Sequence, residues 1–121
     1  MNTNFSSPSL LSATTIINTS VENEAGENLG KIEELMVDLN SGRIAYAVLS
    51  FGGFLGMGDK LFAIPFEALT FDSVEEKIIL GVDKEVLKNA PGFDKDNWPD
   101  TSKHAWLVDV YEYYGYRPYW S

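Results

Sequence analysis

The sequence contains no cysteine and a single histidine, His104, among its 121 residues. The lack of cysteine excludes disulfide bridges, thiol catalysis and cysteine-ligated zinc or iron–sulfur centres. A Ser–His–Asp arrangement would have to use His104, and no Gly-x-Ser-x-Gly motif accompanies it. We therefore expect no catalytic residue, no metal site and no cofactor.

Positive charge is also scarce, because 9 Lys and Arg residues face 18 Asp and Glu residues, for a net charge of −9. Nucleic-acid binding needs clustered Lys and Arg, so nucleic acid is not an expected partner. The longest uncharged run, Ile44–Gly58, is shorter than the roughly 20 residues of a membrane-spanning helix. The first residues lack the basic and apolar segments of a secretory signal. We expect a cytoplasmic protein without membrane insertion.

Short strands and tight turns dominate the first two thirds of the chain. The β-branched residues of Thr14–Ile17 predict a first strand. Leu29–Leu39 predicts a second, with Leu35, Val37 and Leu39 on one face, and a change of parity at Glu33-Glu34 indicates a bulge. Asn40-Ser41-Gly42 fits a type I turn followed by a left-handed residue, so it predicts a hairpin.

The returning strand of this hairpin, Arg43–Phe51, is apolar on both faces. A strand of this kind has to be covered on both sides. The cover is either another layer of the same chain or a partner subunit.

Three further strands are predicted, at Leu61–Ile64, Ala68–Asp72 and Lys77–Val82. Two helices are predicted after them, at Asp83–Ala90 and Thr101–Tyr114. Pro65 marks a strand end because proline cannot donate to a sheet ladder. In the last helix, Trp106, Val110 and Tyr113 form one predicted apolar stripe. The fold class is therefore mostly β: a small barrel or curled sheet of about six short strands, with one or two short C-terminal helices. We expect a flexible tail at residues 1–10 and a single domain over residues 11–121.

Two loops resemble known ligand sites without completing them. The glycines between Ser50 and Lys60 suggest a phosphate loop, but Asp59 precedes the lysine and no Ser or Thr follows it. Asp94 and Asp96 match the start of a calcium loop, but Trp98 stands at the third ligand position. The glycine loop instead offers a candidate contact surface for a partner, made of three apolar residues: Phe54, Leu55 and Met57.

Half of the aromatic residues lie at the C-terminus, from Trp98 onward. Two interpretations stay open: this segment closes the protein's own core, or it carries aromatic anchors for a partner protein. The candidate anchors are Tyr116, Tyr119 and Trp120.

Four segments of the chain follow one another in a characteristic order: Leu29–Leu39, Gly42–Pro65, Asp83–Pro99 and Tyr113–Trp120. Together they resemble the PRC-barrel domain in its stand-alone bacterial form, from about Leu11 onward. The resemblance implies a small, mostly antiparallel β-barrel, related to the cytoplasmic domain of the photosynthetic reaction-centre H subunit and the C-terminal domain of the ribosome maturation factor RimM. In both, the domain is a binding module, and family members are often dimeric.

We therefore predict a non-catalytic PRC-barrel binding module, a self-associating adaptor or stress-related accessory protein. Its expected partners are a second copy, in a homodimer or other homo-oligomer, and an unidentified protein. The alternative function is a barrel that binds a small ligand or an ion, in which Glu33, Glu34 and Asp38 bind a cation or sense protons.

Overall fold

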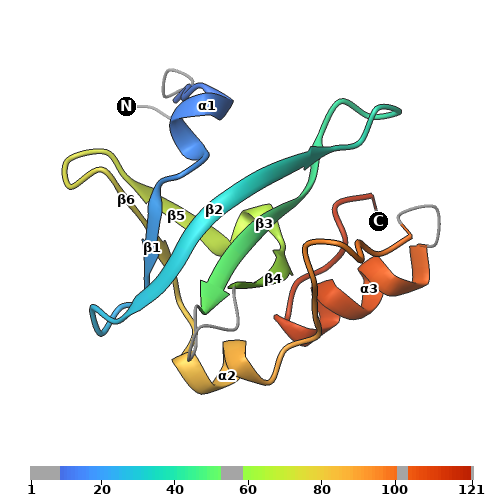
Figure 1. The fold of residues 1–121 in the computed structure, drawn as a ribbon. Coiled ribbons are helices and arrows are strands. Elements are labelled where there is room, and N and C mark those ends of the chain that lie inside the picture. The colour runs from blue at the N-terminus through green and yellow to red at the C-terminus, as the bar shows by residue number, and fades with distance from the viewer. Residues whose placement is uncertain (1–8, 53–58, 101–103, 121) are drawn as a thin grey trace.

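The computed structural model describes residues 9–52, 59–100 and 104–120. In chain order the elements are α1 (Ala13–Ile16), β1 (Ser20–Glu22), β2 (Asn28–Val37), β3 (Ile44–Gly52), β4 (Asp59–Ile64), the 3-10 helix η2 (Phe66–Ala68), β5 (Leu69–Asp72), β6 (Lys77–Leu80), α2 (Lys84–Lys88), β7 (Gly92–Phe93) and α3 (His104–Tyr113). The strands form one seven-stranded sheet in the order β5-β6-β1-β2-β3-β4-β7 (Figure 1). The predicted mostly β fold with short helices is confirmed.

The sheet is mixed rather than purely antiparallel. Strands β1 and β6 run parallel, with Val21 opposite Ile78, and the other five neighbouring pairs are antiparallel. Within the described ranges, no strand pairing joins β5 to β7, so the hydrogen-bonded order has two ends. The prediction of a mostly antiparallel fold of about six strands is confirmed, and the observed sheet has seven strands with one parallel pair.

The central hairpin β2–β3 follows the sequence prediction closely. The pairing passes from Ile32 directly to Glu34, which confirms the predicted bulge. Because of this bulge, Ile32 and Leu35 pack into the same core although they differ in parity. The turn closes with the Asp38 amide donating to the Arg43 carbonyl over 2.7 Å, and Gly42 takes a φ of +77°, which favours glycine.

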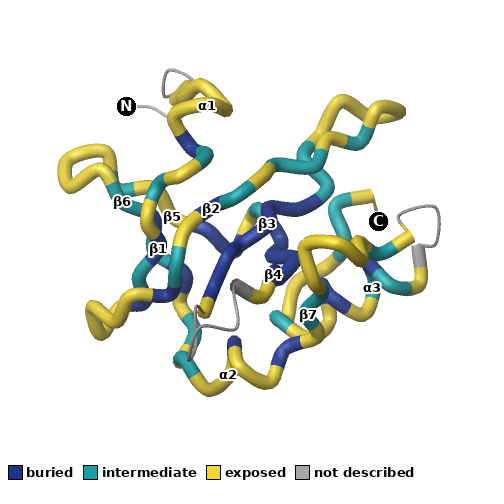
Figure 2. Tube along the Cα trace, viewed as in Figure 1, coloured by how far each residue is buried: buried dark blue, intermediate teal, exposed yellow. Residues whose placement is uncertain are grey.

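The apolar cover on the two faces of β3 comes from the chain itself. Ala47, Leu49 and Phe51 pack into one core cluster, with residues from β1, β2 and β6. Tyr46 and Val48 on the other face pack into a second cluster, with three residues of α3: Leu107, Val110 and Tyr111. Figures 1 and 2 show α3 lying on this side of the buried centre of the sheet. The two apolar faces of β3 therefore give no argument for a partner subunit.

Two strand predictions are wrong, namely the position of the first strand and the residue at which β2 ends. Thr14–Ile17 does not form a strand, because Ser12 caps the short helix α1 by accepting a hydrogen bond from the Thr15 amide over 3.2 Å. The first strand is β1 instead. Strand β2 ends at Val37, so Leu39 lies in the turn and is 92% exposed rather than sharing a strand face.

Among the later elements, the short strand β7 was not predicted and the apolar stripe of α3 was predicted wrongly. The structure confirms three predicted strands, which are β4, β5 and β6. It also confirms the strand end before Pro65 and the helix after Asp83. The apolar stripe of α3 is wrong, because Tyr113 is 39% exposed while Leu107 and Tyr111 are buried. No helix in the described ranges is long and apolar enough to cross a bilayer.

Candidate functional site

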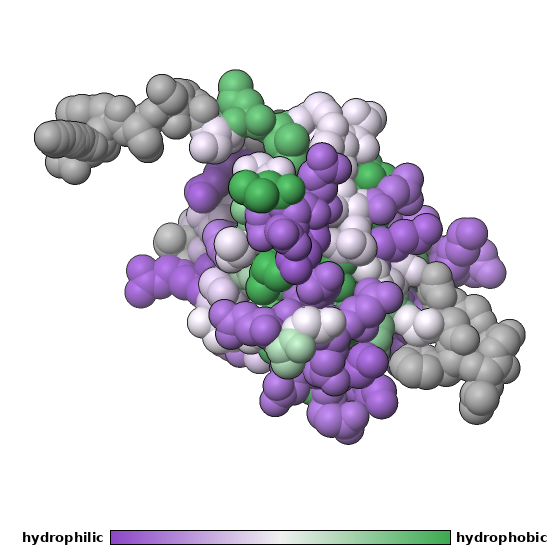
Figure 3. Space-filling model, turned by 90° about the vertical axis from the view of Figure 1, so that its left-hand side faces the viewer, coloured by the Kyte–Doolittle hydropathy of each residue, from purple (hydrophilic) through white to green (hydrophobic). Residues whose placement is uncertain are grey.

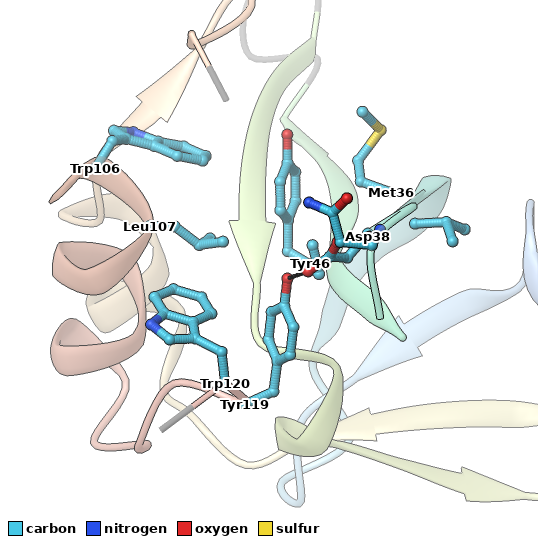
Figure 4. A pocket seen from close by; sticks show the side chains of 10 residues that line it. Met36, Asp38, Tyr46, Trp106, Leu107, Tyr119 and Trp120 are labelled. Carbon is cyan, nitrogen blue, oxygen red and sulfur yellow. Dashed lines mark hydrogen bonds between the residues drawn. The ribbon is translucent and has the colours of Figure 1, made fainter. Parts of the chain in front are cut away.

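A cavity of about 200 Å³ lies between the β2–β3 hairpin and the C-terminal part of the chain (Figure 4). We call it the hairpin cavity. Strand β2, the turn and β3 form one wall, and α3 with the segment after it forms the other. Its lining residues are Met36, Val37, Asp38, Asn40, Ala45, Tyr46, Trp106, Leu107, Tyr119 and Trp120.

Tyr119 fastens the C-terminal segment to the hairpin. Its hydroxyl donates a hydrogen bond of 2.6 Å to Oδ2 of Asp38. Arg43, at the start of the returning chain, donates from Nη1 to the Tyr119 carbonyl over 2.8 Å. The Arg43 guanidinium also lies 5.4 Å from the centre of the Tyr119 ring, within the range of a cation–π contact. These three contacts hold the two walls of the cavity together.

The Asp38 carboxylate is held by donors that favour its charged form. Besides the Tyr119 hydroxyl, the amides of Asn40 and Ser41 donate to Oδ1, over 2.9 and 3.4 Å. The bond from Tyr119, followed by that from Asn40, keeps the pKa of Asp38 below its usual value. Asp38 forms no ion pair with a Lys or Arg in the described ranges. Among the described residues, the cavity therefore contains a carboxylate that hydrogen bonds hold without an ion pair.

Tyr46 is buried with its polar atom unsatisfied. The residue is 1% exposed, and its hydroxyl has no hydrogen-bond partner within the described part of the chain. The ring packs edge-to-face on Trp106, with ring centres 5.5 Å apart. In Figure 4 the ring stands between Trp106 and Met36, and its hydroxyl points away from Asp38. Burial raises the pKa of Tyr46, so the phenol stays neutral.

The contact residues predicted from the sequence fall into two groups. Tyr119 and Trp120 line the hairpin cavity, and Trp120 and Tyr116 are each 38% exposed. The other group, on the glycine loop, lies outside the described residues: Phe54, Leu55 and Met57. The role of all six in binding a partner stays a prediction.

The aromatic C-terminus is divided between buried and exposed residues, so the interpretation as a core segment holds for part of it and the interpretation as partner anchors stays a prediction. Tyr111 is fully buried against β3 and donates a hydrogen bond to the Ala45 carbonyl over 2.8 Å. Tyr113, Tyr116 and Trp120 keep more than a third of their surface exposed. The segment therefore closes the core with one set of aromatic residues and displays another set.

Sequence reasoning did not identify Tyr46, Trp106 or Met36 as site residues. Their signal is that of ordinary core positions, and only the packing of α3 on β3 turns them toward a cavity. The expected cation site of Glu33, Glu34 and Asp38 is not assembled. In the described ranges, no three acidic or histidine side chains gather closely enough to hold a metal ion.

A second cavity of about 390 Å³ lies between α1 and the β5–β6 hairpin. Its charged lining includes Lys77, whose ammonium pairs with Glu22 at 3.2 Å and Glu75 at 3.8 Å. The bond to Glu22 raises the pKa of Lys77 and keeps it charged. Because its lysine is already paired, this cavity offers less for ligand recognition than the hairpin cavity does.

Comparison with known proteins identifies the fold family. The family model described as the PRC-barrel domain matches residues 8–87, about two thirds of the chain. The hairpin that forms one wall of the cavity lies inside this range, whereas α3 and the C-terminal segment lie beyond it. A search of curated proteins gave no match. With the predicted motifs, the observed sheet and this match in agreement, the chain belongs to the PRC-barrel domain family.

Proposed function

We propose that this PRC-barrel protein is a non-catalytic adaptor that binds another protein through one surface. We call it the hairpin–arm surface and define it by five residues: Val37, Leu39, Tyr116, Tyr119 and Trp120. The observation that supports it is exposure, because Leu39 is 92%, Val37 is 55% and Trp120 is 38% exposed. Val37 and Trp120 line the same cavity, so the hairpin and the C-terminal segment adjoin there.

Exposed apolar groups that lie together favour a contact site. Single exposed apolar residues are common on soluble proteins, whereas adjoining ones mark binding surfaces. Aromatic side chains supply much of the energy of protein interfaces because they bury a large area with few rotatable bonds. By comparison, the face on the side of β5 and β6 is mostly hydrophilic, with hydrophobic side chains in separate small patches (Figure 3).

Charge favours a partner with a basic surface. The chain carries a net charge of −9, and opposite charge accelerates the encounter of two proteins. A second copy carries the same charge, so self-association has to rely on the apolar hairpin–arm surface. A homodimer would then bring the same surface of two copies together.

The test compares two exposed apolar residues on different turns. Leu39→Asp places a charge on the hairpin–arm surface, and Val74→Asp places the same charge on the β5–β6 turn, where Val74 is 88% exposed. We expect the first variant, and not the second, to lose concentration-dependent mass in sedimentation and to lose the proteins that the wild type retains from host lysate. If both variants behave as the wild type does, the surface is not the binding surface.

A further inference from the structure

The hairpin cavity combines aromatic rings with an unpaired carboxylate. Four of its lining residues are aromatic: Tyr46, Trp106, Tyr119 and Trp120. The rings of Tyr119 and Trp120 meet edge-to-face, with centres 4.9 Å apart. Asp38 lies beside them, bonded to the Tyr119 hydroxyl. Aromatic faces and a carboxylate both attract positive charge, so the two features select the same class of ligand.

In the described ranges, no basic side chain forms an ion pair with Asp38. Arg43 is the nearby candidate, but its Nη1 donates to the Tyr119 carbonyl and its guanidinium lies over the Tyr119 ring. In the described ranges the ion pairs join other residues, namely Lys77 with Glu22 and Glu75, and Lys88 with Glu85. A cationic ligand would therefore neutralise the negative charge of the Asp38 carboxylate without displacing an ion pair seen in the described ranges.

We propose that the hairpin cavity binds a small alkylammonium compound, with its cationic group between the Asp38 carboxylate and the rings of Tyr119 and Trp120. A hard metal ion fits less well, because Ca²⁺ takes 6–8 oxygen ligands, whereas Asp38 supplies one carboxylate and no three acidic or histidine side chains gather in the described ranges. An anion is disfavoured by Asp38 and by the net charge of −9. The volume of about 200 Å³ corresponds to roughly seven water molecules, which suits a compact ligand.

The unsatisfied hydroxyl of Tyr46 is an independent sign of a ligand. A buried hydroxyl without a partner costs free energy, and it is retained most easily where a bound molecule completes it. It points away from Asp38 (Figure 4) and is shielded from solvent, so a ligand reaches it only if the side chains around it move. A ligand with a hydroxyl or ether oxygen a few bonds from its ammonium group matches these two polar groups, the Asp38 carboxylate and the Tyr46 hydroxyl.

Choline and its uncharged isostere 3,3-dimethylbutan-1-ol are the probes for the test. They have the same shape, so their difference in affinity reports the charge alone. We expect saturable binding of choline by calorimetry and by NMR shifts of the Trp120 indole, with the isostere about tenfold weaker. Sodium chloride at equal concentration controls for ionic strength. Equal affinity for the two compounds, or no saturable binding of choline, would overturn the proposal.

One charge variant and one matched pair of tryptophan variants locate the site. Asp38→Asn keeps an acceptor for Tyr119 but removes the charge, so choline should lose its advantage over the isostere. Trp120→Leu should weaken choline binding about tenfold, whereas Trp98→Leu, equally exposed at 38% but outside the cavity lining, should not. Circular dichroism confirms that each variant folds. Unchanged choline binding in both Asp38→Asn and Trp120→Leu would refute the assignment to this cavity.

The hairpin cavity and the hairpin–arm surface share Val37, Tyr119 and Trp120 but differ in their other residues. Leu39 belongs to the hairpin–arm surface but does not line the cavity. Leu39→Asp is therefore expected to retain choline binding even where it abolishes partner binding. Asp38→Asn is expected to weaken choline binding and to retain partner binding.

Discussion

Gly30 shows how one residue decides whether two strands can meet. It has a φ of +110°, and a Cβ at this position would overlap the Ser50 carbonyl oxygen on β3. Any larger residue has to adopt an unfavourable backbone conformation and also push β2 away from β3. Each of these effects costs about 1–3 kcal/mol.

The first prediction is that Gly30→Ala lowers the free energy of unfolding by about 2–4 kcal/mol. Urea denaturation monitored by circular dichroism measures it. Gly81→Ala is the matched control, because a Cβ there meets nothing within 4 Å and its φ is not in the left-handed region. Equal stability of Gly30→Ala and the wild type would mean that the close approach of β2 and β3 is not required.

The pair of Asp38 and Tyr119 makes stability depend on pH at both extremes. Burial, and then the Asp38 carboxylate, raise the pKa of Tyr119 from 10.0 to about 12. Folding therefore favours the neutral phenol, and this contribution is complete below pH 10 and is lost as the pH rises to about 12. The pKa of Asp38 is lowered from 3.8, so its contribution is complete above that pH and is lost as the pH falls through the lower, folded-state value.

The second prediction concerns the difference in stability between the wild type and Tyr119→Phe. We expect it to be greatest between pH 5 and 9 and to shrink toward both pH extremes, because the variant cannot form the bond to Asp38. Tyr46 and Tyr114 also have raised pKa values because they are buried, but both proteins retain them and Tyr119 is not among the causes, so their effects cancel. Urea midpoints over the pH range measure the difference, and a constant difference would contradict the prediction.

At the scale of elements, local sequence signals predicted turns better than they predicted which face of a helix is buried. The β2–β3 hairpin was predicted with its bulge and its turn, because parity and an Asn-Ser-Gly sequence are local properties. Thr14–Ile17 was mispredicted because the cap from Ser12 outweighs the strand propensity of β-branched residues. The parallel pairing of β1 with β6 joins residues far apart in the sequence, so no local pattern reports it.

The stripe of α3 was mispredicted for a different reason. This helix carries apolar residues on most of its circumference, so several stripes satisfy helical periodicity. Only packing selects among them, and β3 turns Leu107, Val110 and Tyr111 inward. The same packing creates the hairpin cavity. For this reason the sequence indicated Tyr119 and Trp120 as exposed aromatic candidates but could not place Tyr46 or Trp106 beside Asp38.

At the scale of the whole molecule, the C-terminal third completes a fold that the family match only partly covers. The match ends at residue 87, yet one face of the central sheet is covered by residues beyond it. Without α3, this face exposes four buried apolar side chains: Tyr46, Val48, Leu61 and Ala63. Losing their burial removes roughly 5 kcal/mol, which is comparable to the whole stability of a small domain, about 5–15 kcal/mol.

The last prediction follows from this comparison. A fragment that ends at Pro99 should lose cooperative urea unfolding and should bind a hydrophobic dye, because the outer face of β3 is uncovered. A peptide of residues 100–121 added in trans should restore the cooperative transition, since it supplies the missing cover. Val110→Asp in the full chain should approach the fragment's behaviour, whereas Asp109→Ala, an exposed position on the same helix, should not. If the fragment instead unfolds cooperatively at the wild-type midpoint, the sheet is stable without α3, and the helix serves mainly to form the second wall of the hairpin cavity.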